Sequence, residues 1–466
     1  MSREKELVKN TAIIAVGKIS TQFISFFLLP LYTACLSTIE YGEVDLNNTI
    51  RSLLIPIVTL MIEQAVYVYM IEAKGDKKQN TKIITTGLSM TTLQCVAFCM
   101  VFYLLSPIVN IPYKNYLCLN IVAAAYAGFM LQAARGLRDV TAYSLGGVIT
   151  SAVTIILNVI CIAYLNLGAR GMLIATFIGN VVCVLFVFFR KRLWTYLKWS
   201  RIEKIQIKEF LKYSLPLIPN QLSIWLISAS DRLIVSAILG NHFTGILAVV
   251  HKFPQVFSTA FNIFHISWTE TVILHIDDKD SASFLSDTIS NIIRLFASMA
   301  IGINCVVSLC FTWLIHKNYM EAYNQIPINM LAMLCNVVVG LLGAIYVARK
   351  ATSEVAKTTI FSGLINVITH FLLIKFIGLY AASVSTFLGY AIMMVYRYID
   401  VQRFVRIKIH ATTILQTIGL YILSVVCYYS QSMVVRLIGT VVLACVVLWL
   451  NQEMLKAVIT IFAKKK

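Results

Sequence analysis

Charged residues are scarce in this sequence, and acidic residues are the scarcest of them. Only 13% of the 466 residues are charged, whereas soluble globular domains carry about 25%. Hydrophobic residues make up 59% of the chain, and the mean hydropathy is +0.80. This composition excludes an ordinary soluble enzyme or binding domain and indicates an integral membrane protein.

Catalytic and metal-binding signatures are missing as well. The 11 cysteines form no CxxC pair, and none lies at metal-ligand spacing from a histidine, so we interpret them as small hydrophobic residues. No GxxxxGK[ST] phosphate loop is present, which disfavours an ATP-driven pump. No nucleophile and base form a recognisable catalytic pattern. We therefore expect no catalytic residues, no metal and no cofactor, and a protein that is not an enzyme.

Long apolar runs fill most of the chain. A helix that crosses a bilayer needs ~20 mostly apolar residues. The first run is longer than the ~7–15 apolar residues of a signal peptide and lacks its cleavage site, so we expect it to be a retained helix. The sequence predicts fourteen spans, at 10–35, 45–71, 83–107, 115–133, 141–165, 171–190, 212–238, 243–268, 285–315, 326–348, 356–376, 379–397, 411–429 and 432–455.

Lysine and arginine gather in the loops on one side of these spans. The chain has 39 Lys and Arg against 21 Asp and Glu, a net charge of +18. Loops on the opposite side hold only Lys114, Arg170, Lys317 and Lys375. Because positive loops face the cytoplasm, we expect both termini to be cytoplasmic. The same rule explains the net charge without nucleic-acid binding.

Two weak internal repeats suggest a duplication. The turn LSTIEYGEVDL (36–46) is similar to LGNHFTGILAV (239–249). The sixth and twelfth spans share four identical pairs at one offset: Gly168 and Gly378, Thr176 and Thr386, Phe177 and Phe387, Gly179 and Gly389. Repeats of this kind are common in transporters. We therefore predict an N-terminal lobe of six helices (1–205), a C-terminal lobe of six (206–408), and an appended helix pair with a basic tail (409–466).

Prolines inside the spans and ionisable residues inside the spans occur mostly in the same predicted helices. The interior prolines fall in the first, second, seventh and eighth spans; they are Pro30, Pro56, Pro216, Pro219 and Pro254. Ionisable residues and broken helices are tolerated in a bilayer only where they face protein or a water-filled cavity. These four spans are therefore expected to line a polar cavity.

The ionisable residues within the spans are mostly cationic. Five candidate cavity cations, Lys18, Arg51, Arg232, Lys252 and Arg294, accompany only two deep acidic residues, Glu63 and Asp231. An unbalanced buried charge is costly unless a ligand neutralises it. This pattern favours an anionic, phosphate-bearing substrate.

Internal pairing is the alternative explanation of these charges. Lys18 can pair with Glu63, and Asp231 with Lys252. Both pairs together would still leave the three arginines of the set without an acidic partner. Glu63 and Asp231 are also the candidate residues for H⁺ or Na⁺ coupling.

Several stretches resemble the Wzx-type polysaccharide flippases, which export O-antigen and capsule units and belong to the multidrug/oligosaccharidyl-lipid/polysaccharide exporter superfamily. The resemblance covers nearly the whole chain and is carried by KNTAIIAVGKIS (9–20), FFLLPLYTACLSTIEYGEVDL (26–46), NLGARGMLIATFIGN (166–180), DRLIVSAILG (231–240) and YVARK (346–350). It implies an all-α polytopic membrane protein whose two six-helix lobes form a V, with a C-terminal helix pair. One departure is that EQAVYVYM (63–70) lacks the arginine that many relatives carry near Val68.

The resemblance also implies a function and a location. The expected substrate is an undecaprenyl-diphosphate-linked oligosaccharide, moved by alternating access from the cytoplasmic to the outer leaflet of the bacterial inner membrane. Membrane lipid and this lipid-linked glycan are the expected partners, and a polysaccharide polymerase is a candidate partner. The first alternative, a drug or organic-ion antiporter of the same superfamily, would be expected to carry more buried carboxylates. The second, a membrane-embedded polymerase or ligase, needs an outer loop larger than HKNYMEAYNQI (316–326).

Overall fold

Helices form all the regular secondary structure in the part of the chain that the structure describes. The structure is a computed structural model, and it describes residues 26–73, 75–107, 111–198 and 204–452. No strand occurs among these residues, so the predicted all-α fold is confirmed. The chain divides into two compact units, Met1–Gly245 and Ile246–Lys466, which we call the N-terminal and C-terminal units.

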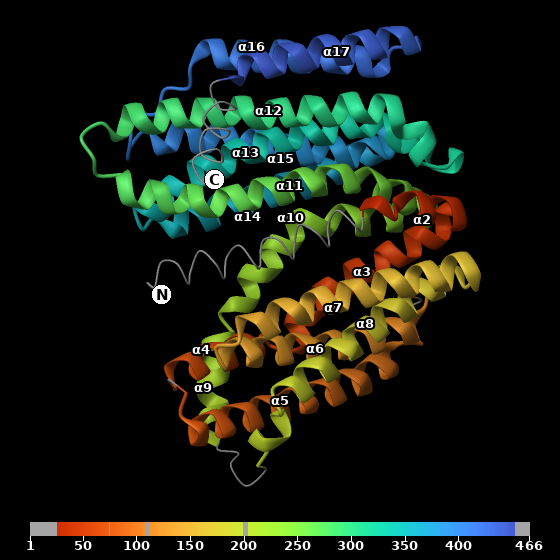
Figure 1. The fold of residues 1–466 in the computed structure, drawn as a ribbon, viewed down its shortest axis with the longest axis vertical. Coiled ribbons are helices and arrows are strands. Elements are labelled where there is room, and N and C mark those ends of the chain that lie inside the picture. Colours follow the sequence, from red (N-terminus) through yellow and green to blue (C-terminus); the bar gives the residue numbers. More distant parts are fainter. Residues whose placement is uncertain (1–25, 74, 108–110, 199–203, 453–466) are drawn as a thin grey trace, which may run out of the picture. The chain divides into compact units, whose positions relative to one another are not determined.

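In the N-terminal unit, α7 and α8 pack side by side, α6 packs against α8, and α4 packs against α6 (Figure 1). Its apolar core gathers around α4, α5, α6 and α8. The helices are α2 (Leu29–Cys35), α3 (Thr38–Val58), α4 (Ile62–Glu72), α5 (Lys77–Leu105), α6 (Lys114–Gly136), α7 (Val140–Val159), α8 (Gly168–Arg190), α9 (Lys204–Ser214) and α10 (Leu217–Ile238). A π-helical turn, Ile160–Tyr164, extends α7, and a short 3₁₀ turn, Leu193–Tyr196, follows α8.

In the C-terminal unit, α15 packs between α13 and α14, and α12 packs against α13, α16 and α17 (Figure 1). Its helices are α12 (Ser281–Leu314), α13 (Ile326–Ala348), α14 (Thr352–Ile377), α15 (Tyr380–Val401), α16 (Ala411–Tyr429) and α17 (Met433–Leu450). A 3₁₀ turn, Lys317–Gln325, precedes α13. One further helix, α11 (Asn241–His275), begins in the N-terminal unit and continues into this one.

Short polar side chains start several helices. Ser37 accepts the backbone N–H of Glu40, and the Glu40 carboxylate accepts the N–H of Ser37, which forms a capping box at the start of α3. Asp76 caps α5 in the same manner, and Asp139 caps α7. These caps satisfy backbone N–H groups that have no partner within the helix. They fix where each span begins after its loop.

The predicted spans correspond to helices throughout the described residues. Nine described helices are long and apolar enough to cross a membrane, and the bent pair α3 and α4 makes a tenth if it forms one span. Three more helices, α10, α11 and α15, coincide with predicted spans but carry charged residues that lower their hydropathy. Most of the first predicted span, 10–35, lies outside the described residues. Together these helices account for the thirteen predicted spans that follow the first.

A glycine shared by the two predicted repeats has the same local role in each. Gly179 lies in α8, and a Cβ atom there would lie 2.9 Å from the carbonyl oxygen of Thr150 in α7. Gly389 lies in α15, and a Cβ atom there would lie 3.2 Å from the carbonyl oxygen of Ser362 in α14. Each glycine lets its helix approach the preceding helix closely. This shared packing supports the duplication.

The two similar turns of the sequence pack against each other within the N-terminal unit. A methyl group on Gly42 would overlap the carbonyl oxygen of Asn241, and one on Gly245 would overlap that of Thr38. These contacts are reciprocal, because Thr38 and Asn241 are equivalent in the two turns, as are Gly42 and Gly245. The Thr38 hydroxyl also hydrogen-bonds to His242 Nδ1 at 2.6 Å. The start of α3 therefore crosses the α10–α11 turn at backbone contact distance.

The compact units divide at a different place from the predicted lobes. The lobe boundary expected at 205/206 stays a prediction about the duplication. The division between compact units falls at 245/246 because α10 packs against α3 and α9. The seventh predicted span thus belongs to the N-terminal unit by its contacts.

Candidate functional site

The second predicted span breaks beside its proline. Pro56 lies near the end of α3, and the chain bends by 52° before α4 begins. Leu60 and Met61 take positive φ angles of 48° and 55°, which non-glycine residues rarely adopt. Glu63, a candidate for ion coupling, follows this break in the first turn of α4. Strain of this kind tends to occur at functional sites.

The other predicted helix breaks have different outcomes. Pro30 lies in the first turn of α2, directly after a turn at Leu28. Pro216 caps α10 and separates it from α9, and Pro219 lies in the first turn of α10. Pro254 does not break its helix, because α11 runs through it without interruption.

Arg232 forms an ion pair, which corrects the interpretation that it lacks an acidic partner. Its Nε atom lies 2.7 Å from Asp45 Oδ2, and about a fifth of each side chain is exposed, 20% and 22%. Asp231, which is buried, accepts the backbone N–H of Arg232. Asp45 is the first residue of the predicted span 45–71, so it is not one of the two deep acidic residues expected from the sequence.

Arg51 is a candidate cation without an acidic partner among the described residues. It is partly buried in α3, and it has no ion pair or hydrogen bond among the residues that the structure describes. The neighbouring turn of α3 is held by Trp225 of α10, whose indole N–H donates to Ser52 Oγ at 2.9 Å and to the Thr49 carbonyl at 3.2 Å. We call Asp45, Arg51, Trp225 and Arg232 the α3–α10 site.

The remaining candidate cations do not join this site. Lys18 lies outside the described residues. Lys252 is partly buried in the part of α11 that belongs to the C-terminal unit. Arg294 of α12 donates from Nη2 to the Thr413 hydroxyl at 3.3 Å, so it links α12 to the first turn of α16. Of the five, Arg51 and Arg232 are the two that lie on α3 and α10, the helices that the Arg232–Asp45 pair joins.

A buried arginine of the C-terminal unit was missed because its predicted span ended on it. Arg397 is only 4% exposed, and α15 continues beyond it to Val401. Its guanidinium donates to the hydroxyls of Thr358 and Thr359 at 2.8–3.1 Å and to the Val339 carbonyl at 3.0 Å. These bonds connect α15 to α13 and α14. Arg397 is thus a packing residue, and each of its three guanidinium nitrogens donates to a group of the protein.

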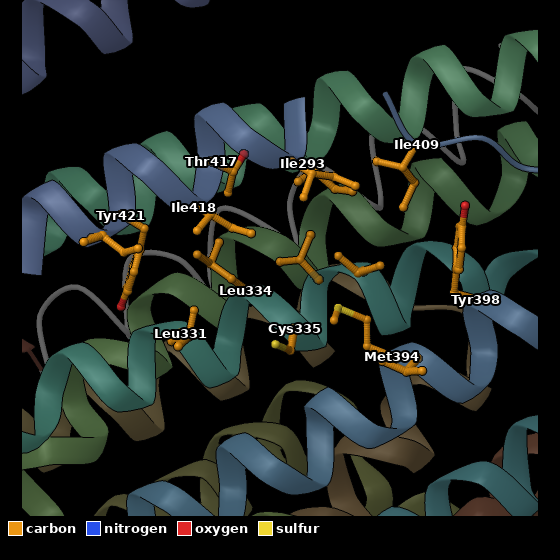
Figure 2. A pocket seen from close by; sticks show the side chains of 15 residues that line it. Ile293, Leu331, Leu334, Cys335, Met394, Tyr398, Ile409, Thr417, Ile418 and Tyr421 are labelled. Atoms are coloured by element: carbon orange, nitrogen blue, oxygen red, sulfur yellow. The ribbon is translucent and has the colours of Figure 1, made fainter. Parts of the chain in front are cut away.

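An apolar pocket of about 590 Å³ lies in the C-terminal unit between α12, α13, α15 and α16. Figure 2 shows Ile418 and Tyr421 of α16 opposite Leu331 and Leu334 of α13, across the pocket. Its volume lies in the ~300–1,000 Å³ range of small-molecule sites. Its lining has almost no polar groups, so it suits a hydrocarbon chain and not a sugar or a phosphate.

Hydrogen bonds at both ends of α16 maintain this pocket. In the middle of α16 the Tyr421 hydroxyl donates to the Pro327 carbonyl, and near its C-terminal end Tyr428 exchanges hydroxyl-to-carbonyl bonds of 2.6 and 2.7 Å with Tyr323. At the other end, the backbone N–H of Lys408, just before α16, donates to Ser286 Oγ at 3.0 Å. These bonds attach α16 and the residues before it to α12, to α13 and to the 3₁₀ turn that precedes α13.

Metal ligands do not cluster in the described part of the chain. No group of three or more His, Cys, Asp or Glu side chains there could hold a metal ion. The described cysteines are all free thiols, and most are buried or partly buried.

Comparison with known proteins gives one family and one fold. The family model for polysaccharide biosynthesis proteins matches residues 7–268. No protein with a curated description matches the sequence. Among solved structures, the chain is similar to the lipid II flippase MurJ in an inward closed conformation, with 13% identity, a TM-score of 0.71 and coverage of 95% of this chain and 100% of that chain.

A second solved structure has the same fold. It is the inward-facing conformation of a multidrug resistance MATE family transporter of the MOP superfamily. The identity is 14% and the TM-score is 0.67, over 84% of this chain and 97% of that chain.

Proposed function

Because this chain belongs to the polysaccharide biosynthesis protein family and has the fold of MOP-superfamily transporters, we propose that it flips a lipid-linked oligosaccharide across a membrane. The proposed substrate is an undecaprenyl-diphosphate-linked repeat unit. It would move from the cytoplasmic to the outer leaflet of a bacterial inner membrane, in O-antigen or capsule biosynthesis. Alternating access would carry the headgroup and glycan past the bilayer interior.

Arg51 is the observation that supports this substrate best. A cation within a span is costly, and transmembrane cations normally pair or face a substrate path. The other arginine of the α3–α10 site is paired with Asp45, whereas Arg51 has no acidic partner among the described residues. A diphosphate would supply the missing negative charge and accept two parallel N–H bonds from the guanidinium.

The polyprenyl chain of the proposed substrate has a matching environment in the C-terminal unit. The apolar pocket of the C-terminal unit suits part of a polyprenyl chain, because its lining offers van der Waals contact and few polar groups. No counterpart for the sugars is assigned. Glu63, beside the α3–α4 break, and Asp231 remain the candidates for H⁺ or Na⁺ coupling.

The main alternative is ion-coupled antiport of a drug or organic ion. The resemblance to the MATE transporter fold favours it, but at 14% identity that resemblance concerns the fold alone. A polymerase or ligase is less well supported, because the longest expected outer loop forms only a short 3₁₀ turn, Lys317–Gln325. An organic cation as the substrate would not balance the charge of Arg51, which has no acidic partner among the described residues.

A flipping assay tests the proposal. The full chain, reconstituted in liposomes, should move a fluorescent undecaprenyl-diphosphate-linked oligosaccharide between leaflets. Arg51→Gln should lower the rate at least about tenfold, the value of one charge-assisted bond. Arg170→Gln, which removes an exposed charge at the start of α8, is the matched control and should not change it. Movement of an organic cation in exchange for H⁺ or Na⁺, without movement of the lipid, would favour the antiporter instead.

A further inference from the structure

The guanidinium of Arg135 lies close to two aromatic rings from other helices. It lies at the end of α6, and its Cζ atom is 4.2 Å from the centre of the Tyr67 ring in α4. The Tyr143 ring of α7 lies 5.6 Å from the same atom. Both distances are within the ~6 Å range of cation–π contacts. The side chain is partly buried, so these contacts fix where the charge lies.

The N–H groups of this guanidinium have no acceptor in the described part of the chain. Arg135 forms no ion pair there, and its side chain makes no hydrogen bond. Aromatic rings stack on the faces of a guanidinium, whereas its five N–H bonds lie in the plane. The two ring contacts therefore do not use up these N–H groups, which are the groups that recognise a phosphate.

The acidic residue nearest to Arg135 in the sequence is already neutralised by other cations. Asp139 lies four residues after Arg135, where it caps α7, and its Oδ2 atom lies 3.0 Å from Lys191 Nζ and 3.9 Å from Arg190 Nε. These two cations balance the Asp139 carboxylate without help from Arg135. The ends of α6 and α8 therefore carry an excess of positive charge.

Close packing places Arg135 against α4. Ala133 and Ala134 are fully buried, and a Cβ atom on Gly136 would lie 2.8 Å from Met70 Cβ. These small residues bring the end of α6 into contact with α4, which carries Tyr67. Gln132, one helical turn before Arg135, has a buried Oε1 atom without a hydrogen-bond partner among the described residues. A free acceptor thus accompanies the free donors on this part of α6.

We propose that Arg135 is a binding residue for the diphosphate of a polyprenyl-linked substrate, at the membrane side where α4 and α6 end. The inference rests on the proposed function and adds to it a second phosphate contact, separate from Arg51. The distribution of lysine and arginine assigns this side to the cytoplasm, where the substrate would enter. Tyr67 and Tyr143 act as positioning residues, because they orient the guanidinium and leave its edge open.

Binding measurements on the full chain in detergent test this assignment. The probes are farnesyl diphosphate, farnesol and phosphatidylglycerol, followed by native mass spectrometry. Arg135→Gln should weaken farnesyl diphosphate at least about tenfold and leave farnesol unchanged. Arg135→Lys should recover part of the loss, because it keeps the charge but not the planar fork. Tyr67→Leu should weaken the diphosphate about two- to fivefold through loss of the cation–π contact.

Arg138→Gln is the matched control. Arg138 lies three residues further along, is exposed, and should change binding of each probe by less than about twofold. Unchanged diphosphate binding in Arg135→Gln would overturn the assignment, as would an equal loss in Arg138→Gln. An equal loss of phosphatidylglycerol would also overturn it, since the site would then bind any lipid phosphate. If the unmodified protein does not prefer farnesyl diphosphate to farnesol, the proposed function fails as well.

Discussion

The side chains of Arg232 and Asp45 lie 2.7 Å apart, Nε to Oδ2, and join α10 to α3. This pair changes the charge balance expected within the spans, because one of the candidate cations is compensated by the protein. The charge available to a substrate is therefore smaller and more local than the sequence alone indicates. In the N-terminal unit, Arg51 and Arg135 are partly buried arginines that have no acidic partner among the described residues.

Removing either member of the Arg232–Asp45 pair should destabilise the protein. Arg232→Ala leaves a carboxylate that is mostly buried, and the loss of one partner typically costs ~1–3 kcal/mol. The unfolding temperature of the purified chain should fall in Arg232→Ala and in Asp45→Ala. The double variant should lose less than the sum of the two, because the pair is then absent as a whole. Strictly additive losses would show that the two groups do not interact.

Two glycines in helices should respond in opposite directions to the same substitution. Gly42→Ala would force a methyl group into the carbonyl of Asn241, and overpacking of this kind typically costs ~1–3 kcal/mol. Gly128 in α6 has open space where its Cβ would lie, so Gly128→Ala should be neutral or stabilise by ~0.5–1 kcal/mol through helix propensity. Thermal unfolding of both variants measures the difference. A stabilising Gly42→Ala would rule out the backbone contact between α3 and the α10–α11 turn.

The substitution Arg397→Lys should destabilise the protein. Lysine keeps the charge but cannot reach the Thr358 hydroxyl and the Val339 carbonyl together, so at least one bond is lost at ~1.5–3 kcal/mol. Arg403 is the control: its side chain is 51% exposed, and its pair with Asp400 belongs to a class worth ~0–1 kcal/mol. Arg397→Lys should therefore lower the unfolding temperature, and Arg403→Lys should barely change it. Equal effects would mean that the buried bonds contribute no more than the surface pair.

The helices were predictable from the sequence, whereas side-chain pairing was not. Each span beyond the first coincides with a described helix because ~20 apolar residues have few alternatives in a bilayer. The Arg232–Asp45 pair depends on how α10 crosses α3, which periodicity does not reveal. A sequence search for acidic residues at the span ends would have offered Asp45 as a partner.

Two arginines show the limit of assigning residues by hydropathy. Arg397 is the last residue of the predicted span 379–397, but hydroxyl and carbonyl partners keep it buried within α15, which continues to Val401. Arg135 lies just beyond the predicted span 115–133, and its contacts with Tyr67 and Tyr143 follow only from the packing of α4, α6 and α7. The apolar pocket is similarly a product of the clamped α16 and has no sequence signature.

The carboxyl group of Asp139 should make the free energy of unfolding depend on pH in the acidic range. Burial alone would raise the pKa of this carboxyl, but the N–H of Ala142 and the cations Lys191 and Arg190 outweigh burial and hold the pKa below its usual value. A lowered pKa means that the carboxylate stabilises the fold above the ordinary aspartate pKa of about 3.9. That stabilisation is lost as the pH falls through the lower pKa of the folded state.

The comparison of Asp139→Asn with the unmodified chain isolates this charge. Asparagine caps a helix about as well as aspartate, so Asp139→Asn keeps the α7 cap and loses only the ionic contacts. At pH 7 the variant should unfold at a lower temperature, by an amount that corresponds to roughly 1 kcal/mol or less for a partly exposed pair. Between pH 4 and pH 2 the two curves should converge, because the native carboxylate becomes protonated there. A difference that stays constant across this range would show that the Asp139 charge does not stabilise the junction of α6, α7 and α8.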